Sequence, residues 1–216
     1  MASRNISQRI LLSVSLLALV LISLVPTPAK AAAGNASALP DLSSFITNIS
    51  NSNAGELRGI YVMGAMALPV VQQPGDNAGF VSTSEQAVTQ FGMVNQFGNI
   101  GLLAHNHLAG QNFFSLVPGQ LIYLVYGNGE VSTFIITQIL RYQAYEPYNP
   151  YSYFRNLDNG LEYSAEDVFR KVYMGDRHVT LQTCIAENGE ASWGRLFVIA
   201  IPLTQYYGSQ NLTTAN

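Results

Sequence analysis

The sequence contains one cysteine, and the residues around it suit a nucleophile. Cys184 ends a stretch rich in Thr and Leu that is predicted to be a β-strand. Strand alternation places Thr180, Gln182 and Cys184 on one face. Leu181 and Thr183 then face the other way. Because the thiolate is the reactive form of a cysteine, catalysis by Cys184 requires a base or a positive charge beside it.

Two side chains qualify as partners of Cys184. His105 ends the apolar run over residues 99–105, so adjacent strand ends could bring its imidazole to the thiol. Arg195 is expected to open the strand that pairs with the cysteine strand, because only residues 185–194, with their turn-forming sequence, separate the two. Such a hairpin would set a permanent positive charge beside the thiol.

A non-catalytic interpretation of Cys184 stays open beside the catalytic one. Free cysteine is among the most buried residue types, and His105 and Arg195 are also ordinary polar residues for strand ends. The alternative to an enzyme is therefore a secreted β-barrel binding module with a buried Cys184. An unpaired thiol in an exported protein is a liability unless it is well buried or used, which leaves both interpretations standing.

Residues 1–31 are typical of an export signal. Arg4 and Arg9 make a positive start, residues 10–25 are apolar, and residues 29–31 (Ala-Lys-Ala) fit a small-x-small cleavage site. The apolar run is shorter than the roughly 20 residues that span a bilayer, so a cleaved signal peptide is favoured over a signal anchor. We expect an extracytoplasmic protein, secreted or attached to the outer face of the cytoplasmic membrane by this segment.

Composition narrows the classes of function. The 216 residues, 48% hydrophobic and 11% charged, suit one domain with a sizeable core. Lys and Arg number 10 against 13 Asp and Glu, with no basic run, so no nucleic-acid partner is expected. One Cys excludes an intramolecular disulfide, and the three His lack metal-ligand spacing. We therefore expect no metal and no cofactor.

The remaining chain is mostly β in pattern. Residues 32–56 are expected to form a tether with a short helix capped by Asp41 or Ser43, residues 57–207 the folded domain, and residues 208–216 a tail. Short helices are predicted over residues 84–91 and after Ser164, and a Tyr- and Pro-rich loop over residues 142–155. Strands are predicted within residues 59–71, 99–105, 120–126, 131–140, 179–185 and 196–203. Many short strands with few helices indicate an all-β barrel or sandwich.

Three motifs together resemble the sortase family of cysteine transpeptidases. They are Thr-Leu-Gln-Thr-Cys at residues 180–184, Arg-Leu-Phe-Val at residues 195–198, and Leu-Ala-His at residues 103–105 followed by Phe-Phe-Ser-Leu-Val-Pro-Gly at residues 113–119. The pattern spans most of the mature chain in the family's order. The resemblance implies an all-β, closed eight-stranded barrel with a few short helices.

The resemblance also implies residue roles. Cys184 would be the nucleophile, His105 its acid/base partner, and Arg195 the group that orients substrate and stabilises the oxyanion, with Thr183 and Ala104 lining the groove. The family cleaves a Leu-Pro-x-Thr-Gly-like sorting signal after Thr, holds the acyl group as a thioester and passes it to an amine. The implied partners are proteins with a C-terminal sorting signal and an amine acceptor on the cell wall or a protein. A cysteine peptidase that hydrolyses the same intermediate is the alternative enzyme.

Some features depart from the family pattern or are ambiguous. A Gly commonly precedes the family's catalytic His, whereas here Ala104 does, and His107 competes for the role; His105 is preferred because the apolar run leads directly into it. His178 is expected to be a partly exposed surface residue. The Tyr-rich loop either forms an apolar wall for a peptide or packs on the barrel by its own aromatics. Calcium assists some family members, but EF-hand spacing is lacking here.

Overall fold

The computed structural model describes residues 39–75 and 77–213, so the proposed export signal lies outside the described residues. The described part contains the following elements: α2 Leu42–Ile49, β1 Leu57–Val62, β2 Met66–Gln72, β3 Val88–Gln90, η1 Gly92–Phe97, β4 Ile100–Leu103, η2 Ala109–Ser115, β5 Leu121–Tyr126, β6 Val131–Ala144, β7 Phe154–Asn156, β8 Glu162–Tyr163, α3 Ala165–Tyr173, β9 Val179–Glu187, β10 Glu190–Pro202 and α4 Leu203–Thr213. Among these residues no helix is both long and apolar enough to span a membrane.

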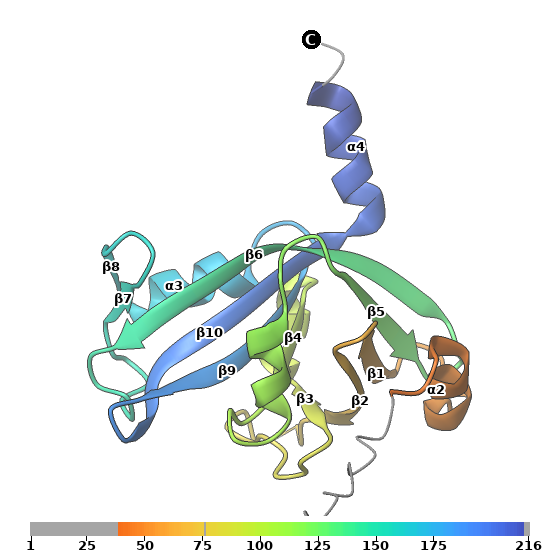
Figure 1. Ribbon diagram of the computed structural model, residues 1–216, viewed down its shortest axis with the longest axis horizontal. Helices are drawn as coiled ribbons and strands as arrows, with labels where there is room; N and C mark the ends of the chain where they lie inside the picture. Colours follow the sequence, from red (N-terminus) through yellow and green to blue (C-terminus); the bar gives the residue numbers. More distant parts are fainter. Residues whose placement is uncertain (1–38, 76, 214–216) are drawn as a thin grey trace, which may run out of the picture. The chain divides into compact units, whose positions relative to one another are not determined.

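The sheet closes into a barrel, as the sequence predicted (Figure 1). The strand order is β10-β9-β4-β3-β2-β1-β5-β6, and β6 pairs in turn with β10. Eight strands therefore form the ring, while β7 and β8 extend the sheet beyond β6. Most pairs are antiparallel, but β2 runs parallel to β3 and β4 runs parallel to β9. The expected closed eight-stranded barrel is confirmed, with two further strands.

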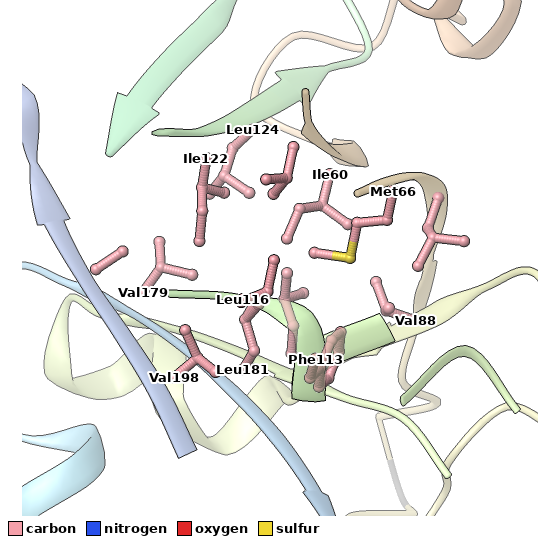
Figure 2. Close-up of a cluster of buried hydrophobic side chains, with 14 of the residues drawn as sticks. Ile60, Met66, Val88, Phe113, Leu116, Ile122, Leu124, Val179, Leu181 and Val198 are labelled. Carbon is pink, nitrogen blue, oxygen red and sulfur yellow. The ribbon is translucent and has the colours of Figure 1, made fainter. Parts of the chain in front are cut away.

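Apolar side chains from the strands and from η2 fill the barrel (Figure 2). Leu181 of β9 and Phe113 of η2 are fully buried there. Because strand side chains alternate, the neighbours of Leu181 along β9 point to the outer face. That face carries a second apolar cluster, in which Val172 and Tyr173 of α3 pack with Phe197 of β10. The two clusters fix β9 on both sides and so fix the position of Cys184.

The helices begin where capping residues predict. Asp41 caps α2 and accepts the Ser44 N–H at 2.9 Å. This bond and the nearby Ser hydroxyls lower the pKa of Asp41 to about 2. At α3, Ser164 and Asp167 bond reciprocally in a capping box, which confirms the helix predicted after Ser164. Gly59 lets α2 lie close to β1, because a Cβ there would lie 2.7 Å from the Phe45 ring.

The helix predicted over residues 84–91 is wrong. Residues 85–86 form a turn, and Val88–Gln90 form β3. Side-chain hydroxyls satisfy the backbone instead of helical bonds: Thr89 Oγ1 accepts the Ser82 N–H at 2.8 Å, and Ser84 Oγ accepts the Gln86 N–H at 3.4 Å. Such local bonds compete with helix formation, and burial of Val88 favours the strand.

Two other expectations also need correction. Arg195 does not open its strand, because β10 starts at Glu190 and is irregular between Glu190 and Gly194. His178 is buried rather than partly exposed; its two ring nitrogens lie 2.6 Å from the Asp176 carbonyl oxygen and 2.9 Å from that of Val172. The Tyr-rich segment is shorter than expected, since β6 extends to Ala144 and β7 begins at Phe154. Residues 145–153 are called the Tyr loop below.

Candidate active site

Arg195 and Cys184 lie directly opposite each other on paired strands. The antiparallel register of β10 and β9 joins Arg195 to Cys184 and Leu196 to Thr183. Cys184 lies on the outer face of β9 and is partly exposed. The expected hairpin therefore brings the guanidinium residue to the thiol residue, although the turn between them is more irregular than the sequence indicates.

The end of β4 carries His105 to the other side of Cys184. In the parallel register of β4 and β9, Leu103 pairs with Gln182. One residue further on, the Ala104 N–H donates to the Gln182 carbonyl oxygen at 3.2 Å. Extending this register two residues past the end of β4 places His105 level with Cys184. We call His105, just past the end of β4, together with Cys184 within β9 and Arg195 within β10 the three-strand row.

Thr183 and Ala104 lie beneath this row. Both side chains are buried, and the Thr183 hydroxyl donates to the Ala104 carbonyl oxygen at 2.8 Å. The His105 carbonyl oxygen accepts the N–H groups of Leu108 and Gly110, both at 3.0 Å. These bonds tie the turn after β4 to β9. Thr183 and Ala104 thus position His105, and neither is among the residues that line the cavity described below.

His107, the competing histidine, lies two residues further along the chain, in the turn after β4. Its ring centroid is 5.6 Å from that of His105, and its side chain is exposed whereas His105 is partly buried. The register of β4 and β9, extended past Leu103, reaches the level of Cys184 at His105 and not at His107. This geometry favours His105 as the partner of the thiol.

Backbone carbonyls hold the Arg195 guanidinium. Its Nη1 donates to the carbonyl oxygens of Ser192 and Gly194, both at 2.8 Å, and its Nη2 donates to that of Pro147 at 2.9 Å. Within the described residues Arg195 forms no ion pair. Its positive charge is therefore oriented but not neutralised by a carboxylate, and one Nη2 hydrogen and the Nε hydrogen are left for other acceptors.

Three contacts around the row were not indicated by the sequence. Ser192 Oγ lies 3.9 Å from Cys184 Sγ. The Tyr148 hydroxyl donates to Glu190 at 2.7 Å, which ties the Tyr loop to β10. The Asn106 side chain donates to the Ala191 carbonyl oxygen at 2.9 Å, so the turn after β4 also reaches β10. Each contact joins segments far apart in the chain or lies within an irregular strand, which no local pattern predicts.

Electrostatics around the row follow from these hydrogen bonds. The Ser192 N–H and the Tyr148 hydroxyl lower the pKa of Glu190, which is therefore ionised at neutral pH. The same bond to Glu190 raises the pKa of Tyr148, which stays a neutral donor. Within residues 39–75 and 77–213, no group of three or more His, Cys, Asp or Glu side chains is arranged to hold a metal.

A cavity of about 700 Å³ opens beside the row on the outer face of the barrel. Gln182 and Arg195 line it, whereas Cys184 and His105 do not; Gln182 shares a strand face with Cys184, two residues further along β9. The Gln182 side chain accepts a hydrogen bond from Tyr173, whose burial raises its pKa and keeps it protonated. The apolar lining comes from α3, the strands and the loops, including Phe91, Leu103, Val168, Phe169, Val172 and Phe197.

The Tyr loop forms part of the cavity wall. Asn149, Pro150 and Tyr151 line the cavity, although the Tyr151 side chain, like those of Tyr148 and Tyr153, is largely exposed. The loop is held at its base by the Arg195 bond to Pro147. Of the two interpretations of this loop, the geometry favours a wall over a segment packed on the barrel by its own rings.

Comparison with solved structures finds sortases. Sortase A from Listeria monocytogenes gives a TM-score of 0.44 and 15% identity, over 68% of this chain and 86% of that one. Sortase A from Corynebacterium diphtheriae gives a TM-score of 0.46 and 15% identity, over 68% of this chain and 60% of that one. Sortase C-1 from Actinomyces oris gives a TM-score of 0.44 and 14% identity, over 76% of this chain and 83% of that one. The likeness is one of fold. No family model and no curated protein sequence matches the chain.

Proposed function

We propose that this protein is a sortase-like cysteine transpeptidase. The observation that carries the proposal is that β9 pairs with β10 on one side, which sets Arg195 opposite Cys184, and with β4 on the other, which leads into the turn that carries His105. The Thr-Leu-Gln-Thr-Cys motif at residues 180–184 supports it independently. Partial exposure of Cys184 on the outer face of β9 speaks against the binding-module alternative, which requires a buried thiol.

The proposed reaction has two halves. The Cys184 thiolate attacks the carbonyl carbon of the scissile peptide bond, and the carbon–nitrogen bond breaks as His105 gives its proton to the leaving amine. In the second half, an incoming amine attacks the thioester, His105 takes a proton from that amine, and the thiolate leaves. Arg195 favours the thiolate and donates its remaining N–H groups to the oxyanion that forms in each half.

The cavity supports a peptide substrate of mainly apolar character. Its lining is mostly aromatic and aliphatic and includes Arg195, which pairs with Cys184 across the two strands. An extended segment such as a Leu-Pro-x-Thr-Gly-like sorting signal could place apolar side chains there and its scissile carbonyl beside Cys184. We propose proteins bearing such a C-terminal signal as substrates, and an amine on the cell wall or on a protein as acceptor.

The proposed place of action is outside the cytoplasmic membrane. The features of residues 1–31 support export, followed either by secretion or by attachment to the outer face of the membrane through that segment. Detection of the mature N-terminus by mass spectrometry on secreted and membrane fractions distinguishes the two.

Peptide cleavage tests the proposed function. The purified protein is incubated with a panel of quenched Leu-Pro-x-Thr-Gly-type peptides, with and without an added amine. We expect cleavage after Thr, and a product joined to the amine when amine is present. Hydrolysis that no amine diverts would instead favour the cysteine peptidase. If no peptide of the panel is cleaved and the Cys184 thiol does not react with an alkylating reagent, the binding module is favoured.

Gly110 offers a test of the turn that positions His105. An added Cβ would lie 2.7 Å from the His105 carbonyl oxygen and 2.9 Å from that of Ala104, and would also collide with the Thr183 hydroxyl. We expect Gly110→Ala to shift the turn and lower kcat/KM by about 100-fold, because a misplacement of about 1 Å at a reacting group has that order of effect. Steady-state peptide cleavage measures this.

Gly208→Ala is the matched control for that substitution. Gly208 lies in α4, and a Cβ there meets nothing within 4 Å. The control should keep wild-type cleavage. Full activity in a folded Gly110→Ala protein, with circular dichroism unchanged, would contradict the positioning of His105 by this turn.

A further inference from the structure

Ser192 carries a hydroxyl to the sulfur of Cys184, although no motif marks it. We infer that Ser192 is a positioning residue of the active site, whose hydroxyl donates a hydrogen bond to the Cys184 thiolate. The inference rests on the proposed function, in which that thiolate is the nucleophile. Ser192 Oγ lies 3.9 Å from Cys184 Sγ, and within the described residues it makes no other hydrogen bond.

An irregularity in β10 brings Ser192 to this position. If the register that pairs Arg195 with Cys184 continued, Ser192 would pair with Glu187, three residues and roughly 10 Å along β9 from Cys184. Instead, the pairing passes from Gly194 opposite Ile185 to Glu190 opposite Glu187, with more residues on β10 than on β9. The extra residues fold Ser192 back toward the thiol, as in a β-bulge that re-aims a side chain.

Both backbone groups of Ser192 are fixed by charged side chains. Its N–H donates to Glu190 Oε1 at 2.8 Å, and its carbonyl oxygen accepts from Arg195 Nη1 at 2.8 Å. Glu190 is held in turn by the Tyr148 hydroxyl at 2.7 Å. These bonds hold the backbone of the bulge in place, and the Ser192 hydroxyl can donate to the sulfur of Cys184.

The chemistry of the pair sets the direction of the bond. A thiolate can only accept, and a serine hydroxyl is a donor that turns freely to suit its acceptor. A donated O–H stabilises the thiolate over the neutral thiol, as hydrogen bonds to a charged acceptor do. Ser192 thus complements Arg195: the guanidinium supplies charge, while the hydroxyl supplies a directed bond that does not depend on the substrate.

The rate of thiol alkylation against pH tests this inference without any substrate. The full chain is treated with iodoacetamide, and because Cys184 is its one cysteine, the measured rate reports that thiol alone. We expect Ser192→Ala to raise the midpoint of the pH profile by about 0.5 to 1 unit, because so long a bond should contribute about as much as an ordinary hydrogen bond and less than a short one to a charged group. Below the midpoint this is a three- to tenfold slower reaction, with the plateau at high pH unchanged.

An isosteric pair separates the hydroxyl from the shape of the side chain. Ser192→Thr keeps the hydroxyl and should keep the wild-type midpoint, whereas Ser192→Val has nearly the shape of Thr and should behave like Ser192→Ala. Ser50→Ala, at the end of α2, is the control for loss of a serine elsewhere and should leave the midpoint of the alkylation profile unchanged. Thermal unfolding of each variant accompanies the profiles.

The outcomes are distinguishable from failure of the proposed function. A raised midpoint in the Ala and Val variants, restored by Thr, supports the inference even if the wild type cleaves no peptide; in that case only the transpeptidase proposal fails. An unchanged midpoint in the Ala and Val variants, or a Thr variant that matches Val, overturns the inference for Ser192. Peptide cleavage by the wild type would then leave the transpeptidase proposal intact.

Discussion

Replacement of Cys184 by alanine is expected to reduce peptide cleavage by at least about 10³-fold, because removal of a covalent nucleophile leaves only binding and oxyanion stabilisation. The chain has no second cysteine to take over the attack. Cys184 is partly exposed on the outer face of β9, so its truncation should cost little stability. The measurement is the initial rate of peptide cleavage, with mass spectrometry of the protein during turnover. The wild type should gain the mass of the acyl group, and the alanine variant should not.

Cys184→Ser is the matched companion to that variant. Serine keeps the shape of the side chain and can still hydrogen-bond, but a hydroxyl is a far weaker acid than a thiol and is not activated by a base suited to a thiol. We therefore expect Cys184→Ser to bind peptide with wild-type affinity in a fluorescence titration and to cleave it no faster than Cys184→Ala. Substantial cleavage by the alanine variant would remove Cys184 from the chemistry and with it the transpeptidase proposal.

The part of the site that the sequence predicted is the part made by local chain geometry. A short connection between two apolar stretches predicts a hairpin, and the hairpin brings Arg195 to Cys184. The capping residues Asp41 and Ser164 likewise predict where helices begin. In each case a few neighbouring residues determine the structure, and the structure agrees.

The pairing of β4 with β9, in contrast, is not determined by neighbouring residues. His105 and Cys184 lie far apart in the chain, and no periodicity in either segment says that the two strands are parallel neighbours. The sequence indicated only that adjacent strand ends could bring His105 to Cys184, and the resemblance to sortases implied that the two act together; neither predicted the parallel pairing. The bulge that carries Ser192 was missed for a related reason, because two extra residues in one strand follow from clamping by Glu190 and Arg195 rather than from the propensity of residues 190–194.

Local signals also failed where tertiary packing decided the outcome. Residues 84–91 have a helical composition, yet burial of Val88 against the core and the bond between Thr89 and Ser82 make them a turn and a strand. His178 is polar and precedes a strand, yet the end of α3 covers it. In both places burial within the fold, together with hydrogen bonds to nearby segments, overrode propensity.

The conservative substitution Arg195→Lys is expected to lower kcat/KM by about 100-fold while leaving the positive charge in place. The planar guanidinium reaches the carbonyl oxygens of Ser192, Gly194 and Pro147 at once and still has N–H groups for a substrate. A lysine ammonium has three hydrogens on one nitrogen. It cannot span acceptors on both β10 and the Tyr loop and also face an oxyanion, so the loop and the substrate compete for it.

Comparison of Arg195→Lys with Arg195→Gln separates the effect of the positive charge from that of the guanidinium geometry. Lysine keeps the charge, so its pH profile of Cys184 alkylation should stay near that of the wild type, whereas Gln should move the midpoint upward. Peptide cleavage should fall in both variants, about 10³-fold for Gln, because both lack the fork that serves the oxyanion. Proteolysis of the Tyr loop should quicken in both, since the bond to Pro147 is lost or weakened. Wild-type cleavage by Arg195→Lys would instead mean that a point charge is enough, and that the carbonyl clamp around Arg195 serves only the fold.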